Sequence, residues 1–396
     1  MKQSHIIHRG TRSAGDGPLE GKNIALHPSV SVRDWPTEAG TRALEGFIAL
    51  EDATVVRRLE AAGATLAGTT SMNELGLGID RDGAGPAVAA READIALLMD
   101  HMGEARIGAA RVGLTGYKPS FGVISRFGLI GLIPSMECLG FMAKDPADIR
   151  NAAAAACGDD EQDFTLSPTM PDFSNPDQTA EYRLGVVSEA LALLDPGDGE
   201  AFRTALSELE PAGCVLRDAS IAEFDLFPTV HHIIGSVEAS SSAGKFDGVR
   251  YGHRARGTRD WNEMYLTSRG EAFGPLLKSF LFQGAFYQFE QYDAFEKACR
   301  LRARLVASLE KLFDDIDFLV LPTTRGGAAP SVETTTTGDL YNLFRFTLPA
   351  NLAGLPAVHL SLPGSAPVQV LGRRLDDARL LDLAVRLNRH HGGTAS

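Results

Sequence analysis

The chain is predicted to adopt an α/β fold, in which the strands of a mixed or parallel sheet alternate with helices on both faces. A short apolar segment at 23–27 is followed by a helical pattern near 55–62 and then by a second apolar segment at 65–69. The same alternation returns in the second half of the chain. With 396 residues, of which 44% are hydrophobic and 22% charged, the chain can bury a large core.

The first elements follow from local signals. Residues 1–20 are polar and glycine-rich and are expected to form an N-terminal arm, poorly ordered and outside the folded domain. The segment 23–27 (NIALH) is predicted to be a strand. Asp52 is expected to cap a helix whose apolar residues recur at helical spacing and which Gly63 ends, and 65–69 (TLAGT) is the next predicted strand.

The region at about 150–181 contains several prolines and many acidic or small residues, and it is expected to be a surface connection. Beyond it, strands and helices are predicted in turn. The predicted strands lie at 183–187, 214–216 and 317–322, and the predicted helices at 199–209, 292–313 and 376–387. The helix at 292–313 carries an apolar stripe of leucines that is expected to face the core.

Composition excludes several classes of protein. Lys and Arg total 38 against 51 Asp and Glu, and the resulting net charge of −13 opposes direct binding to nucleic acid or to an anionic membrane. No segment reaches the roughly 18 apolar residues of a membrane span. The cysteines lie far apart, which suggests neither a disulfide framework nor a zinc site. We therefore expect a cytoplasmic protein without a cofactor.

Several segments occur in an order that resembles one known family. They are GKNIALHPSVSVRDWPTEAGT (21–41), EDATVVRRLEAAGATLAGTTSMNE (51–74), GLTGYKPSFGVISRFGLIG (113–131), EASSSAGKFDGVRYGHRA (238–255), EMYLTSRGEAFG (263–274), LPANLAGLPAV (348–358) and VQVLGRRLDDARLL (368–381). Together they resemble the amidase signature family, and within it the A subunits of the tRNA-dependent amidotransferases. The resemblance implies a single α/β/α sandwich domain at 21–396, built around a large mixed sheet.

The resemblance also implies a serine nucleophile, a second serine that follows a cis peptide bond, and a lysine base. This chain departs from that pattern at all three positions. His27 stands at the lysine position (ALHPS), Asp80 at that of the second serine (GIDRDGAG), and Glu104 at the nucleophile (DHMGEAR). A glutamate cannot carry an acyl group as a stable ester, so the acyl-enzyme route of the family is expected to be closed.

Two interpretations of these positions remain open. In the first, His27, Asp80 and Glu104, with His101 and Asp100 beside them in sequence, form a rebuilt site for proton transfer or for a metal ion. Their spacing is not a metal signature, so no metal ligand is assigned. In the second, they line a pocket that has lost its catalytic role. The adjacent histidines 231 and 232 point about 100° apart on a helix and are expected to face solvent.

Arg269, in TSRGEAFG, matches the position that in the amidotransferases pairs with the carboxylate of the substrate, and a guanidinium suits that task. Its acidic companion position holds Phe344, so recognition of an amino group is expected to be lost. Lys118 is expected to be structural.

The leading hypothesis is a pseudo-amidase that serves as a binding, scaffold or regulatory component beside another protein subunit. The alternative is an enzyme with a rebuilt His/Asp/Glu site that acts on a small carboxylate or amide, and the third hypothesis is an active amide hydrolase.

Overall fold

Eleven strands form one mixed sheet in the computed structural model, which describes residues 4–13, 15–177, 179, 181–325, 336–362 and 365–392. Across the sheet their order is β1 (Ile6–Ser13), β3 (Thr65–Thr70), β2 (Asn23–Leu26), β4 (Ile95–Asp100), β6 (Cys138–Ala143), β5 (Thr115–Lys118), β10 (Ala357–Leu360), β11 (Val368–Gly372), β9 (Phe318–Pro322), β7 (Tyr182–Val187) and β8 (Cys214–Ala219). Strand β2 is parallel to β3 and β4, and β7 is parallel to β8 and β9, whereas the central pairs are antiparallel. This is the mixed sheet that the resemblance implied.

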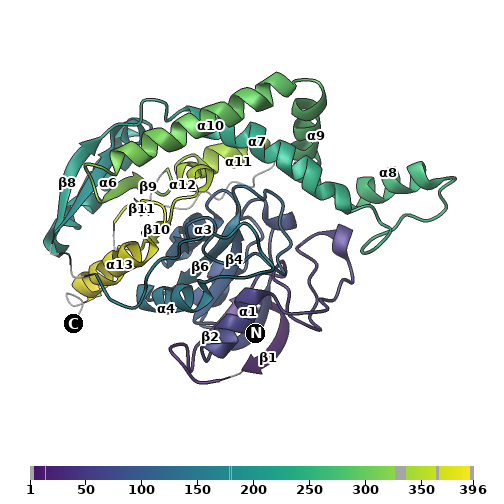
Figure 1. Ribbon diagram of the computed structural model, residues 1–396, viewed down its shortest axis with the longest axis horizontal. Helices are drawn as coiled ribbons and strands as arrows, with labels where there is room; N and C mark the ends of the chain where they lie inside the picture. Colours follow the sequence, from purple (N-terminus) through teal and green to yellow (C-terminus); the bar gives the residue numbers. More distant parts are fainter. Residues whose placement is uncertain are drawn as a thin grey trace.

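Alternating residues of the buried strands pack on opposite faces of the sheet. Phe318 and Val320 of β9 join one apolar cluster, and Leu319 and Leu321 join another. The first face is covered by α1 (Thr54–Ala61), α4 (Pro146–Ala156), α6 (Pro196–Ser207) and α13 (Asp377–Gly392). The second is covered by α2 (Ala84–Ala89), α3 (Glu104–Val112), α5 (Ser188–Ala192), α7 (Leu226–Ser242), α9 (Pro275–Phe289), α10 (Tyr292–Leu312), α11 (Thr337–Phe344) and α12 (Leu348–Ala353). Helix α8 (Trp261–Ala272) extends to the side of these layers (Figure 1).

The N-terminal arm is the clearest correction to the sequence-based expectations. Residues 6–13 are not a poorly ordered extension, because they form edge strand β1, antiparallel to β3. The polar segment HRGTRS gives no apolar pattern that would predict this strand. Ile6 supplies the buried apolar contact, and backbone hydrogen bonds to β3 supply the pairing. Arg12 adds an ion pair to Asp52 at 2.7 Å. Asp52 also accepts from the Arg33 backbone N–H at 2.7 Å and, contrary to expectation, does not cap α1, whose N-cap residue is Ala53.

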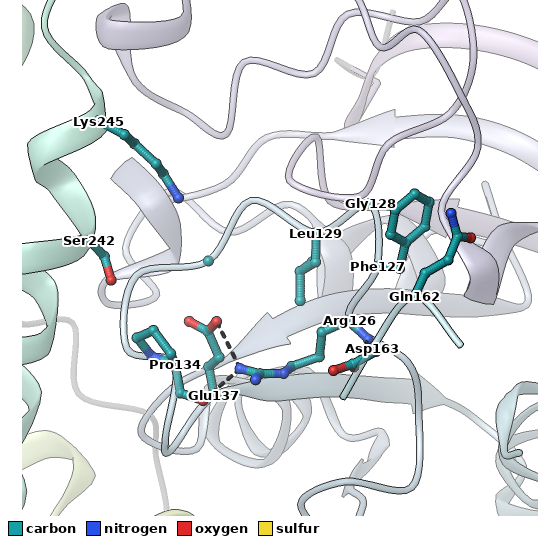
Figure 2. A pocket seen from close by; sticks show the side chains of 11 residues that line it. Arg126, Phe127, Gly128, Leu129, Pro134, Glu137, Gln162, Asp163, Ser242 and Lys245 are labelled. Carbon is teal, nitrogen blue, oxygen red and sulfur yellow. Dashed lines mark hydrogen bonds and ion pairs between the residues drawn. The ribbon is translucent and has the colours of Figure 1, made fainter. Parts of the chain in front are cut away.

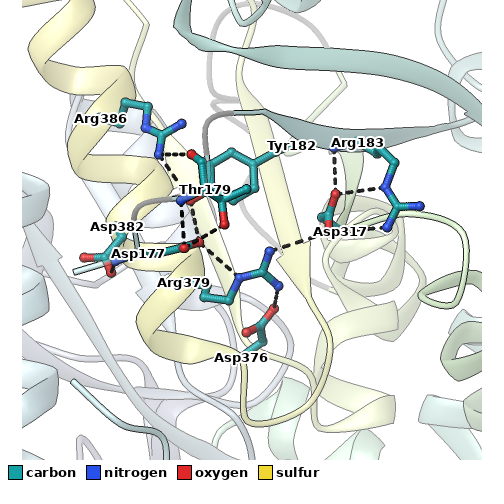
Figure 3. Close-up of polar contacts among 9 residues, drawn as sticks. All are labelled: Asp177, Thr179, Tyr182, Arg183, Asp317, Asp376, Arg379, Asp382 and Arg386. Carbon is teal, nitrogen blue, oxygen red and sulfur yellow. Dashed lines mark hydrogen bonds and ion pairs between the residues drawn. The ribbon is translucent and has the colours of Figure 1, made fainter. Parts of the chain in front are cut away.

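The predicted surface connection begins later than expected, because α4 continues to Ala156. The C-terminal end of this connection lies against α13 and β7 through the polar cluster drawn in Figure 3. Arg379 of α13 forms ion pairs with Asp177, Asp317 and Asp376 at 3.1, 3.5 and 3.0 Å, and Tyr182 donates a hydrogen bond to Asp177 at 2.6 Å. The two halves of the chain therefore share one sheet, and these charges join the end of the connection to α13 and to Asp317, which directly precedes β9. Within the described part of the chain, no helix is both long and apolar enough to cross a membrane.

Candidate functional site

Glu104 is the first residue of α3, directly after the turn that leaves the buried strand β4. The turn depends on Gly103, whose φ of +127° lies in the region that favours glycine and where an added Cβ would lie 2.3 Å from Thr347 Oγ1. Asp100, at the end of β4, accepts a hydrogen bond from the Ala105 N–H at 3.0 Å and one from Asn351 Nδ2 at 2.7 Å. The N-terminus of α3 is thus held rigidly against the sheet.

The Glu104 carboxylate folds back onto the turn that precedes it. Its Oε2 atom accepts hydrogen bonds from the backbone N–H groups of His101, Met102 and Gly103 at 2.7, 2.8 and 3.1 Å. The residue is 2% exposed, and its Oε1 atom has no hydrogen-bond partner among the described residues. Burial, together with the nearby charge of Asp100, raises the pKa of Glu104 to about 8 despite these three donors. At neutral pH the protonated form therefore predominates.

His101 lies in the same turn and is fully buried. Its Nε2–H donates to the Leu75 carbonyl at 2.9 Å, while Nδ1 lies 3.5 Å from Glu137 Oε2, too far for a hydrogen bond. The His101 carbonyl accepts from His231 Nε2 at 3.2 Å, and His231 Nδ1 lies 2.9 Å from the Tyr341 hydroxyl. The expectation that His231 faces solvent is therefore wrong: it is buried, and burial lowers its pKa to about 3.

His27 follows β2 and has different partners from Glu104. Its Nδ1 accepts from the Met99 N–H at 3.3 Å, which leaves the proton on Nε2 to donate to Asp82 at 3.0 Å. Asp80, the carboxylate that the sequence placed beside His27, is exposed, and Asp82 takes that place two residues later. Asp82 also accepts from the Ala84 N–H at 2.8 Å and so fixes the start of α2.

The predicted constellation thus divides into two separate groups. Among the described residues, no hydrogen bond or ion pair connects His27 with Glu104, and no group of three or more His, Cys, Asp or Glu side chains is placed to hold a metal ion. One group is the His27–Asp82 pair at the end of β2. The other is Glu104 with the backbone of its own turn, extended through His101 to His231.

Arg106, which sequence reasoning missed, is the buried cation behind Glu104. Its guanidinium donates to Gln369 Oε1 at 2.7 Å, to the Thr347 carbonyl at 3.2 Å and to Asn351 Oδ1 at 2.5 Å, and it lies 3.9 Å from Asp100. It joins α3 to β11 and α12. A lone arginine in a helix gives no local signal of this role, since Gln369 is 263 residues away.

Arg269 binds backbone carbonyl groups and is not available to a substrate in an open site. Its Nη1 donates to the carbonyls of Ala243 and Phe246 at 2.6 and 3.0 Å, and its guanidinium stacks over the Phe273 ring at 5.1 Å. Phe344 is fully buried. Lys118 is also buried and donates to the adjacent Pro119 carbonyl at 2.7 Å.

Comparison with known proteins identifies the fold to which this site belongs. The amidase family model matches residues 2–83 and 81–381, which is nearly the whole chain. The chain belongs to the amidase family. Similar amidase-family proteins include the glutamyl-tRNA(Gln) amidotransferase A subunit of Symbiobacterium thermophilum, 32% identical over 98% of this chain and 88% of the relative. That of Chloroflexus aurantiacus is 33% identical over 95% of this chain and 84% of the relative.

Solved structures confirm the predicted fold. The glutamyl-tRNA(Gln) amidotransferase A subunit of Thermotoga maritima has a TM-score of 0.77 at 24% identity, and the match covers 97% of this chain and 88% of that one. A 6-aminohexanoate cyclic dimer hydrolase has a TM-score of 0.76 at 21% identity, with 95% and 86% covered. These likenesses establish the amidase-signature sandwich.

Proposed function

We propose that this amidase-family protein is a pseudo-amidase that has lost serine-dependent amide hydrolysis and acts through binding. One observation carries the proposal: Glu104 Oε2 accepts hydrogen bonds from three successive backbone N–H groups at the N-terminus of α3. In acyl-transfer enzymes, backbone donors beside the nucleophile stabilise the developing oxyanion. Here the side chain at the nucleophile position occupies such donors itself, and no substrate oxygen can share them while it stays there.

The surroundings of Glu104 support the same conclusion. The residue is 2% exposed, and Thr347 packs against Gly103 in the preceding turn, so a substrate has no room to approach the carboxylate. His27, 3% exposed, is committed to Asp82 and the Met99 backbone. A rebuilt site that acts on a small carboxylate or amide would need these two groups to face one substrate, and their separate partners favour the non-catalytic interpretation.

The proposal is tested by covalent labelling. We expect the purified protein to remain unlabelled by a serine-directed fluorophosphonate probe and to leave glutamine, asparagine and aryl amides intact, because the nucleophile position holds a buried glutamate. Intact-mass spectrometry and an ammonia-release assay measure the two outcomes. The Glu104→Ser variant, measured in parallel, shows whether a serine at this position is reachable by the probe. Stoichiometric labelling of the wild-type chain would overturn the proposal.

A partner protein is the second part of the proposal. Phe282, Phe286 and Phe289 lie at helical spacing on α9 and are 73%, 50% and 75% exposed, and Tyr292 continues the stripe with 53%. Exposed aromatic patches of this kind mark protein interfaces. Exposed carboxylates at positions 290 and 293 lie beside the stripe, and the chain carries a net charge of −13, so the partner that fits is a basic protein chain. The relatives are themselves named as subunits.

For this partner we expect a one-to-one complex when the chain is co-expressed with a basic protein encoded beside it in the genome. Size-exclusion chromatography with light scattering measures the complex. The Phe286→Asp/Phe289→Asp variant should remain folded and lose the partner, since both side chains are exposed. A complex that survives this variant, or a stable homodimer lost in the same variant, would contradict the assignment.

The free cysteines of the protein accord with a reducing cytoplasm as the compartment in which it acts.

A further inference from the structure

An open cleft of about 380 Å³ lies between the 126–137 segment and the turn η4 (Ala243–Lys245) that follows α7. Figure 2 shows Ser242 and Lys245 on one side of the cleft and Arg126, Leu129 and Glu137 on the other. None of the residues at the altered amidase positions lines it. Glu137, which lines the cleft, lies 3.5 Å from His101 Nδ1, so the cleft is close to the Glu104 turn although Glu104 does not line it.

The acidic groups of the cleft are already satisfied by the protein. Glu137 is 4% exposed, and its Oε2 accepts from the backbone N–H groups of Leu132 and Ile133 at 2.7 and 2.8 Å, while Oε1 lies 3.3 Å from Arg126 Nη1. Asp163 accepts from the Arg126 backbone N–H at 2.8 Å. Neither carboxylate therefore needs a cation from a ligand.

Lys245 is the charged group of the cleft that remains available. Figure 2 shows its side chain extending into the cleft, and its ammonium lies 5.2 Å from the centre of the Phe246 ring. Within the described residues no hydrogen bond or ion pair engages this ammonium, but burial lowers the pKa of Lys245 and the nearby charge of Glu137 opposes that shift. The Ser242 hydroxyl lies on the same side of the cleft (Figure 2). A lysine held in this position is suited to an anionic ligand.

Arg269 explains how Lys245 is held there. Its Nη1 binds the carbonyls of Ala243 and Phe246, which lie on either side of Lys245 in the chain. The arginine that the sequence suggested as a carboxylate clamp therefore acts as a positioning residue for a different cation.

We propose that the cleft binds a small organic monocarboxylate, with its carboxylate on Lys245 and Ser242 and its apolar part against Leu129 and Pro134. Two cations and two carboxylates line the cleft, so its formal charge is balanced and a single negative charge is accommodated more easily than two. The volume admits a molecule of the size of benzoate with water around it. This proposal does not depend on the loss of catalysis at Glu104.

Titration of the purified chain with sodium benzoate and sodium acetate, at constant ionic strength against sodium chloride, tests the proposal. We expect saturable calorimetric binding that the Lys245→Met variant weakens about tenfold or more, as for the loss of a charge-assisted hydrogen bond. The Lys144→Met variant, which removes an exposed lysine that does not line the cleft, should bind as wild type. Melting curves without ligand establish that both variants fold.

Three results would overturn the proposal: no carboxylate binding above the chloride control, equal binding by Lys245→Met, or binding of inorganic phosphate in preference to the carboxylates. The Ser242→Ala variant adds an independent arm, with weaker benzoate binding expected. Because these variants leave Glu104 unchanged, their failure would not bear on the labelling experiment.

Discussion

The Glu104→Gln variant should become progressively more stable than the wild-type chain as the pH rises from about 5 to 8, and it should keep that advantage above pH 8. The pKa of Glu104 is raised to about 8 in the folded protein by burial and by Asp100, and it returns to its ordinary value on unfolding. Between these two values the folded state holds a proton that the unfolded state has lost. The contribution of Glu104 to the free energy of unfolding is therefore fully present below its unfolded-state pKa. This contribution is lost as the pH rises to the folded-state pKa of about 8.

The expected slope is up to about 1.4 kcal/mol per pH unit in the difference between variant and wild type. Glutamine keeps the shape of the protonated carboxyl and an oxygen for the three backbone donors, but it cannot ionise. Urea unfolding at pH 5.5, 7.0 and 8.5 measures the difference. Glu310→Gln, at an exposed position of α10, is the matched control and should follow the wild type at every pH. A constant difference between Glu104→Gln and wild type would contradict the predicted titration.

The Arg106→Met variant should lose about 3–5 kcal/mol of unfolding free energy, the cost of breaking a buried charge network by removing one partner. The guanidinium is fully buried, and its removal leaves the Thr347 carbonyl and the side-chain oxygens of Asn351 and Gln369 without this donor. Asp100 also loses the cation 3.9 Å away. Denaturant unfolding at pH 7 measures the loss.

A lysine at position 106 should not restore stability, because an ammonium cannot reproduce the forked donor geometry of the guanidinium. Arg300→Met is the control: among the described residues this exposed arginine has one surface ion pair, with Glu296 at 3.8 Å, and its loss should cost about 0.5 kcal/mol or less. If Arg106→Met were no more destabilising than Arg300→Met, the network would not hold α3 in place.

Local patterns predicted those elements whose own residues decide their structure. The buried strand β9, the leucine stripe of α10 and strand β7 are found within a residue or two of their expected bounds. Strand β1 was missed because its sequence is polar and its structure depends on pairing with β3. Whether an edge segment forms a strand is decided by the strand that it pairs with, so its own sequence gives little indication of the pairing.

Sequence reasoning named Glu104 and His27 as candidates, but it missed Asp82 and Arg106 and did not predict the contacts of the site. The segment resemblance placed Glu104 and His27 at altered family positions, and in the structure His27 directly follows β2 while Glu104 follows the turn after β4. It did not show that Asp82 rather than Asp80 would contact His27. It also missed the burial of His231, because that burial depends on contacts with distant parts of the chain, here Tyr341 and the His101 carbonyl.

The central claim is that the Glu104 carboxyl group occupies the backbone donors at the N-terminus of α3. The most direct measurement is the pH titration of the backbone amide resonances of His101, Met102 and Gly103 by NMR, from pH 5 to pH 9.5. We expect the three resonances to move together with a midpoint near 8, and this movement to disappear in Glu104→Gln. Resonances that stay fixed over this range, or that move equally in Glu104→Gln, would contradict the claim.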